Sequence, residues 1–236
     1  MPLDRRCALL ALLALPAACS IQRLGPLAAL PIAAPADAGT LRAPEVGQRW
    51  RYQQINRFNS VVLDEVEESV ASLGDTVVVQ RRSTRGRPMA DERHASWGQL
   101  WRDPAWDYPM TFEAPVPLWP SALQPGRASR VYTHYLMDGG SFRYRIEVHS
   151  EVHGWERVTV AAGTFDTLRI ERFIRLGHQD PTRLTTWRRD TLWLSPKVGR
   201  WVARETSGRY LVPDEGWWRQ RESLEDQLRW ELTDWR

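Results

Sequence analysis

The chain has 236 residues, of which 42% are hydrophobic and 26% are charged. That hydrophobic fraction is enough for a packed core and excludes a protein that is disordered throughout. The formal net charge is +3, but the 32 basic side chains are interleaved with 29 acidic ones. Because a nucleic-acid partner requires a basic patch and the sequence contains none, we expect no such partner.

The N-terminal residues have the three-part layout of an export signal. Arg5 and Arg6 form a short basic region, residues 7–15 are apolar, and small residues follow up to Ala18. Signal peptides join a charged end to about 7–15 apolar residues and a small-residue cleavage site. The apolar run is too short to span a bilayer, which takes about 20 residues. We therefore predict a lipoprotein-type signal peptide over residues 1–18.

The residue that follows this segment carries a resemblance. Cys19 directly follows Ala17 and Ala18, which resembles the lipobox of bacterial lipoproteins. Pro16 departs from that motif, because a leucine-like residue is usual there. The resemblance implies that Cys19 becomes the first mature residue and is diacylated, and two acyl chains anchor a protein stably. Ser20 implies the outer membrane, with the domain on its periplasmic face. The alternative is plain secretion.

The mature chain divides into a tether and one domain. Residues 19–44 are rich in Ala, Pro and Leu without sustained periodicity, so we expect a flexible tether with a reach of at most about 3.6 Å per residue. That reach predicts a domain that stands off the membrane. Residues 45–236 show neither a repeat nor a second boundary and form a single β-domain. Cys7 and Cys19 are the only cysteines, which excludes a disulfide or a cysteine metal site in that domain.

From residue 46 onward, the pattern is that of β-strands. In residues 142–148, apolar side chains alternate with charged or polar ones, which places one set in the core. The alternation continues through 158–160 and 168–170, on either side of a short turn that ends at Gly163. Other strands flank turn signals, and we place them at 61–71, 76–82, 193–194, 201–202 and 229–235. A helical spacing competes only at 222–228.

Strands separated by short turns predict an all-β protein, folded as an antiparallel half-open barrel or sandwich. A transmembrane barrel needs an outward apolar band about 25 Å tall. Here the positions that alternate with the apolar ones carry Arg, Glu, Asp and His in most strands. We therefore expect the domain to lie outside the bilayer.

Two segments resemble uncharacterised bacterial periplasmic and lipoprotein β-domains. Residues 158–170 read V-T-V-A-A-G-T-F-D-T-L-R-I, where those domains have V-T-V-P-A-G-T-F-D-x-x-x-I, and residues 193–199 match their W-x-x-P-x-x-G element. The resemblance covers roughly residues 46–236, and Ala161 replaces the usual proline. It implies an architecture similar to the half-open barrels of periplasmic lipoprotein carriers, which wrap a central cavity. It brings no catalytic residues.

Catalytic signatures are absent from the sequence: it has no G-x-S-x-G, H-E-x-x-H, P-loop or G-x-G-x-x-G motif. We therefore predict a non-enzymatic protein without a cofactor. His149, Glu151 and His153 share one face of a strand, and such side chains suit zinc. Strand neighbours two apart are separated by some 6–7 Å, so we interpret this face as solvated and predict no metal site.

Thirteen tryptophans are an unusual number for this length. Several lie in predicted strands, but others crowd a proline-rich segment between residues 97 and 120, which we interpret as a long loop. We predict that its aromatic residues bind the ligand, namely Trp101, Trp106, Tyr108, Phe112 and Trp119. Trp217 and Trp218 could join the same surface.

Three roles remain open for this aromatic segment. It could line a pocket for an apolar, lipid-like ligand, stack on sugar rings of a glycan or peptidoglycan, or only plug the core. The prediction is an outer-membrane lipoprotein whose periplasmic β-domain binds an apolar ligand or an envelope protein partner. The alternatives are a glycan-binding module and an envelope hydrolase whose site is assembled only in three dimensions.

Overall fold

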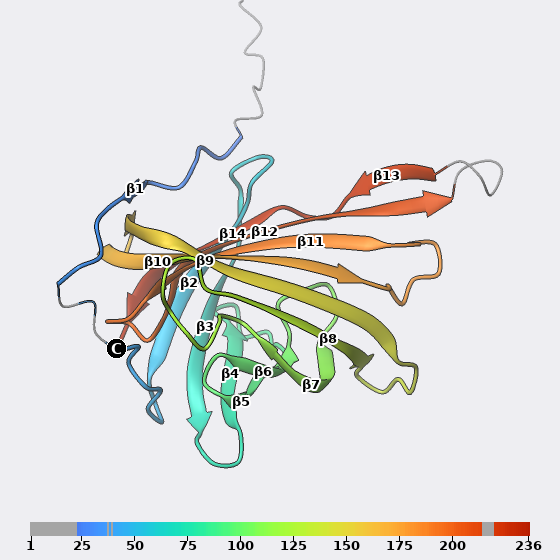
Figure 1. Cartoon of the computed structure of the whole chain (residues 1–236), viewed down its shortest axis with the longest axis horizontal. Helices are drawn as coiled ribbons and strands as arrows, with labels where there is room; N and C mark the ends of the chain where they lie inside the picture. The colour runs from blue at the N-terminus through green and yellow to red at the C-terminus, as the bar shows by residue number, and fades with distance from the viewer. Residues whose placement is uncertain (1–22, 37, 39, 214–219) are drawn as a thin grey trace, which may run out of the picture.

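The computed structural model of the protein describes residues 23–36, 38, 40–213 and 220–236, and their regular secondary structure consists of β-strands (Figure 1). Among these residues there is no helix with the length and apolar character needed to span a bilayer. Cys19, Trp217 and Trp218 lie outside the described residues.

All the strand pairs are antiparallel and belong to one sheet. The first seven strands are β1 Ala29–Pro31, β2 Arg49–Asn56, β3 Val62–Ser72, β4 Val77–Ser83, β5 Glu92–Ser96, β6 Gln99–Asp103 and β7 Met110–Pro117. The other seven are β8 Ala128–Met137, β9 Tyr144–Val160, β10 Gly163–Leu176, β11 Thr186–Ser195, β12 Arg200–Pro213, β13 Gln220–Leu224 and β14 Leu228–Trp235. The all-β class is therefore confirmed, including strand at 220–224 where a helix competes in the sequence.

The sheet closes into a barrel. Its strand order runs from β9 through β10, β11, β12, β14 and then β2 to β8, and β8 pairs again with β9 from Ala128↔Glu151 to Tyr135↔Tyr144. Only β1 and β13 lie outside this ring of twelve described strands. The prediction of a barrel is correct, but a half-open barrel or a sandwich is not. Alternation in a sequence reports which side chains face inward, whereas closure depends on edges that are distant in the chain.

The β9–β10 hairpin forms where the alternation predicts it. Gly163 has φ +129° at the turn, and Val158, Leu168 and Ile170 are buried. The predicted alternation starts too early, because β9 begins at Tyr144 and Phe142 is 66% exposed. This hairpin supplies the longest strands of the barrel and the surface on which the candidate site lies.

The segment predicted as a flexible tether lies against the barrel over most of its described length. β1 pairs with β9, from Ala29↔Val158 to Pro31↔Glu156. The backbone N–H of Leu24 donates to the carbonyl of Arg57 at 3.2 Å. The described residues from Leu24 to Pro31 therefore follow the barrel surface. A three-residue strand is too short to give a periodic signal, which is why the sequence reads as a linker.

The barrel interior contains aromatic rings and paired charges. Tyr52 stacks on Trp201 with ring centroids 4.0 Å apart. Asp190 accepts hydrogen bonds from Arg172 and Arg204 at 2.5 and 2.7 Å, and all three side chains are buried. Buried ions persist only when they are paired and hydrogen-bonded. Charged residues that the sequence suggests are outward-facing therefore lie inside the barrel, where they fill it together with the aromatic core.

Candidate functional site

The proline-rich segment between residues 97 and 120 is not a long loop, because most of it forms β6 and β7. β7 accommodates Pro115 because its pairing with β6 is interrupted between Leu100↔Val116 and Arg102↔Thr111, and Pro117 is the last residue of the strand. Proline lacks the N–H that a continuous ladder needs. The segment is therefore part of the barrel wall.

The five predicted ligand-binding aromatic residues do not gather on one surface. Phe112 and Trp119 are 4% and 3% exposed and belong to the core, so their rings offer no face to a ligand. Trp101 is half-buried in β6, and Tyr108 is 47% exposed. Trp106 alone of the five lines a cavity of about 370 Å³ at one end of the barrel. The structure therefore does not bring the five side chains together around one pocket, and their binding role stays a prediction.

The side chains weighed as zinc ligands lie on the outer face of β9. His149 is exposed, and His153 Nε2 lies 3.5 Å from a carboxylate oxygen of Glu171 on β10. Val148 and Val152, which alternate with these side chains along the strand, are buried on the opposite face. This strand has the alternation that the sequence predicts.

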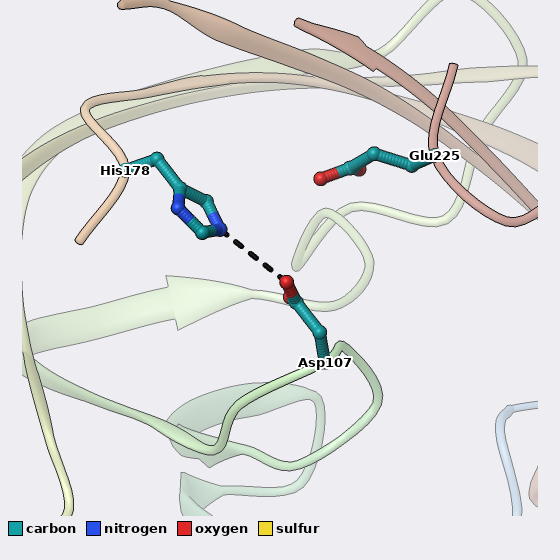
Figure 2. Close-up of side chains that lie close together, drawn as sticks. All are labelled: Asp107, His178 and Glu225. Carbon is teal, nitrogen blue, oxygen red and sulfur yellow. Dashed lines mark hydrogen bonds and ion pairs between the residues drawn. The ribbon is translucent and has the colours of Figure 1, made fainter. Parts of the chain in front are cut away.

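A cluster that sequence reasoning missed lies beside the cavity that contains Trp106. Asp107 follows β6, His178 follows β10, and Glu225 lies between β13 and β14; one potential ligand atom from each lies within 4.8 Å of the others (Figure 2). Three separate loops supply these residues. Only closure of the barrel brings the loops together, so no spacing in the sequence could indicate the cluster.

Two arginines neutralise the carboxylates of this cluster. Arg188, whose side chain is 2% exposed, donates from Nε to Glu225 at 2.7 Å and from Nη2 to Asp107 at 2.7 Å. Arg183 donates to Glu225 at 2.9 Å. Partial burial opposes the charge of Asp107, but its hydrogen bond with His178 and the charge of Arg188 outweigh burial and lower its pKa.

The tautomer of His178 follows from its partners. The backbone N–H of Asp180 donates to Nδ1 at 3.0 Å, so the proton of the neutral ring is on Nε2, which lies 3.3 Å from Asp107 (Figure 2). A metal ion would need the lone pair of Nε2 and would lie beside two guanidinium groups. The donor set therefore fits an ion-pair cluster that joins the loops better than it fits a cation site. We call this cluster the latch; it consists of Asp107, His178, Arg183, Arg188 and Glu225.

A groove of about 770 Å³ lies on the outer face of β8, β9 and β10. One cross-strand row along it is Tyr132↔Glu147↔Arg175, and the next row includes His134↔Arg145. The loop after β10 closes one side. The complete lining consists of Tyr132, Thr133, His134, Arg145, Ile146, Glu147, Arg175, Leu176, Gly177, Leu184 and Thr185.

The groove is cationic and partly apolar. Neither Arg145 nor Arg175 has a salt bridge among the described residues, although Arg175 lies across from Glu147. Glu147 accepts a hydrogen bond from Arg130 at 2.8 Å, which lowers its pKa, and the charge of Arg175 helps to lower the pKa of that carboxyl. Leu184 is 41% exposed on the opposite side from Tyr132 on β8. The groove thus presents two available guanidinium groups beside aromatic and aliphatic surface.

Comparisons with known proteins identify the fold. The chain is similar to a candidate lipoprotein from Parabacteroides distasonis ATCC 8503, with a TM-score of 0.54, 14% identity, and coverage of 84% of this chain and 99% of that chain. It is also similar to a candidate exported protein with a YmcC-like fold from Bacteroides fragilis NCTC 9343, with a TM-score of 0.52, 14% identity and the same coverage. No protein-family model and no curated protein matches the sequence. At this identity the likeness shows the YmcC-like fold alone.

Proposed function

We propose that the protein is an exported, lipid-anchored protein of the bacterial outer membrane whose barrel binds an anionic amphiphile without catalysis. The export part is supported by the signal-like residues 1–18 and by Cys19. It is supported further by two proteins of the same fold that are described as a candidate lipoprotein and a candidate exported protein.

The observation that carries the binding proposal is the outer groove on β8–β10. Its volume of about 770 Å³ lies in the range of small-molecule sites, about 300–1,000 Å³. Arg145 and Arg175 supply planar donors that match a carboxylate or phosphate. Tyr132 and Leu184 supply apolar surface for the remainder of the molecule. An amphiphile with an anionic head would contact both parts of the groove, whereas a purely apolar ligand would make no use of the two guanidinium groups.

The cluster of Asp107, His178 and Glu225 supports a structural role over the hydrolase alternative. Hydrolysis by paired carboxylates needs one that is free to accept or donate a proton. Both carboxylates here accept hydrogen bonds from Arg188. The glycan alternative relied on aromatic residues that the barrel distributes between its core and separate surfaces.

Membrane fractionation tests the anchor. In a bacterial host, the full chain should sediment with outer membranes, and the Cys19→Ser variant should appear in the soluble periplasmic fraction. Labelling with a radioactive fatty acid should mark only the chain that retains Cys19. Membrane retention of Cys19→Ser without label would overturn the lipid anchor.

Native mass spectrometry tests the ligand. The Cys19→Ser chain is purified from a periplasm with its N-terminal segment intact, because that segment includes β1. We expect a co-purifying mass, or binding of an added single-chain anionic phospholipid. The double variant Arg145→Gln, Arg175→Gln should lose it, whereas Arg82→Gln, an exposed arginine on β4, should keep it. An apo protein that binds no added lipid contradicts the proposal.

A further inference from the structure

The chain is fixed to the barrel close to its proposed anchor. The N–H of Leu24 donates to the carbonyl of Arg57, and Nη2 of Arg229 donates to the carbonyl of Gly25 at 2.7 Å. The N–H of Arg57 in turn donates to the carbonyl of Gln227 at 2.9 Å. The described N-terminal segment therefore begins over the outside of the barrel, beside the loop between β13 and β14.

The chain between this point and Cys19 is short. At about 3.6 Å per residue, the step from Cys19 to Arg23 spans at most about 14 Å. β9 has 17 residues and is about 56 Å long at 3.3 Å per residue. The distance from Leu24 to a bilayer that holds an acylated Cys19 is therefore much shorter than the length of β9. With the proposed anchor at Cys19, the barrel therefore lies close to the membrane and not at the full reach of residues 19–44.

The face beside this exit point has the composition of a membrane-contact surface. Gln227 lines a groove of about 320 Å³ on the outside of β10–β13. Phe173 is 45% exposed on β10 and Leu224 is 58% exposed on β13. Trp187 lies in the same groove, next to Arg209 in the cross-strand register. The large apolar side chains thus lie exposed on strands that are neighbours in the sheet.

Positive charge surrounds these apolar side chains. Arg189, the cross-strand neighbour of Phe173, forms no ion pair within the described part of the chain. Arg209 lies 5.6 Å from the centre of the Trp187 ring and pairs with Glu222, and both ends of that pair are about half exposed. Aromatic and aliphatic side chains with arginines between them are typical of surfaces that rest in the interface of an anionic bilayer.

From these observations we infer that the outer face of β10–β13, formed by Phe173, Trp187, Arg189, Arg209 and Leu224, rests on the anionic surface of the membrane that holds the lipid anchor. The inference depends on the proposed anchor for its geometry. A bilayer is the partner of this face because the chain leaves the barrel beside it, and the residues between Cys19 and Leu24 are too few to hold the barrel far from the membrane.

Vesicle flotation tests this contact without the anchor. Full-length mature protein carrying Cys19→Ser should float with vesicles that contain phosphatidylglycerol and not with phosphatidylcholine vesicles. Each arginine near an anionic surface contributes about 1 kcal/mol, so Arg189→Gln, Arg209→Gln should weaken binding roughly 25-fold. The matched control Arg82→Gln, Arg127→Gln, with two exposed arginines outside this face, should bind like the parent. Equal flotation of both double variants overturns the inference.

A second measurement reports orientation on the anchored protein. A polarity-sensitive dye on Phe173→Cys should shift to the blue on vesicle-reconstituted, acylated protein, while the same dye on Leu73→Cys, directly after the C-terminal end of β3 and 45% exposed, should not. Protein that is acylated but shows no shift at residue 173 contradicts the membrane face alone. Protein that floats and shifts but carries no acyl group contradicts the proposed anchor and leaves the face supported.

Discussion

The guanidinium of Arg200 lies 2.6 Å from the carboxylate of Glu68, and both side chains are at most 2% exposed. The same nitrogen of Arg200 lies 2.9 Å from Glu92, so one cation joins β12 to β3 and β5 inside the barrel. Burial opposes the charge of Arg200, but the two carboxylates outweigh burial and raise its pKa. β12 is not hydrogen-bonded to β3 or β5 in the sheet. This ion-pair network therefore connects these strands across the interior of the barrel.

Replacing this cation should destabilise the fold strongly. Arg200→Met leaves Glu68 and Glu92 buried without their shared partner, and removal of one member of a buried pair costs about 3–5 kcal/mol. Urea denaturation should show that loss in the free energy of unfolding. Arg157→Met, which removes the solvent-exposed pair with Asp166, should leave the midpoint almost unchanged. Similar midpoints for the two variants would contradict the assigned role of Arg200.

Acid should weaken the fold through Glu92. Burial alone would raise its pKa, but the charge of Arg200 and the hydrogen bond with His94 outweigh burial and hold the pKa well below its usual value. Because the pKa of an unfolded glutamate is about 4.3, the stabilisation is complete above that pH and is lost as the pH falls below it. Urea midpoints measured from pH 7 to pH 3 should therefore fall less steeply for Glu92→Gln than for the parent.

Trp119 and Tyr108 should behave differently, although the sequence places both in one aromatic segment. Trp119→Ala empties a core position, for which about 3–5 kcal/mol is expected. Tyr108→Ala removes a half-exposed ring and should change stability by no more than about 0.5 kcal/mol. Thermal or urea unfolding compares the two. A stable Trp119→Ala protein would restore the ligand-binding interpretation of that residue.

Gly98 should tolerate no side chain. Its φ is +88°, and a Cβ would lie 2.2 Å from Nε1 of Trp119. Strained backbone and overpacking each cost about 1–3 kcal/mol, so we expect Gly98→Ala to lose at least about 2 kcal/mol. Gly154, in β9, has no such neighbour within 4 Å. Gly154→Ala is the control in the same denaturation series and should remain close to the parent.

The latch at the barrel end should control the loop after β10. Arg188→Met removes the cation that holds Asp107 and Glu225 together, so the carboxylates that bind His178 and Arg183 are less firmly positioned. Trypsin under native conditions should then cut after Arg183 faster than in the parent. Arg209→Met, which removes an exposed ion pair on the adjacent strand, is the control for general loosening. Unchanged cleavage in Arg188→Met would contradict the latch.

The sequence predicts local pairs well, because neighbouring strands leave a periodic trace. The alternation around Gly163 and the turn signal at 195–199 both correspond to hairpins of the barrel. It does not predict closure, since β2 meets β14 through edges at opposite ends of the domain's sequence, which no local pattern describes. The three loops that form the latch meet for the same reason.

Buried charged residues are the second feature that the sequence does not predict. Arg172, Arg188 and Arg204 occupy positions that read as solvent-facing, because an arginine in an alternating strand is usually outward. Each is paired with an aspartate or glutamate from another element, so burial is compatible with its charge. The outer groove escaped prediction too: Arg145 and Arg175 belong to different strands, and only the register places them in adjacent rows of one face.

The first strand of the ring, β2, pairs with its last strand, β14. β1 pairs with β9, and seven strands lie between these two in the sequence. Contacts between such distant segments form slowly, because the whole loop must be ordered before they are made. A chain of this topology cannot complete its native structure while its C-terminus is still being synthesised. Under the proposed export, a chain that leaves the ribosome with its last strands unmade therefore meets the export machinery with an open, unpaired sheet.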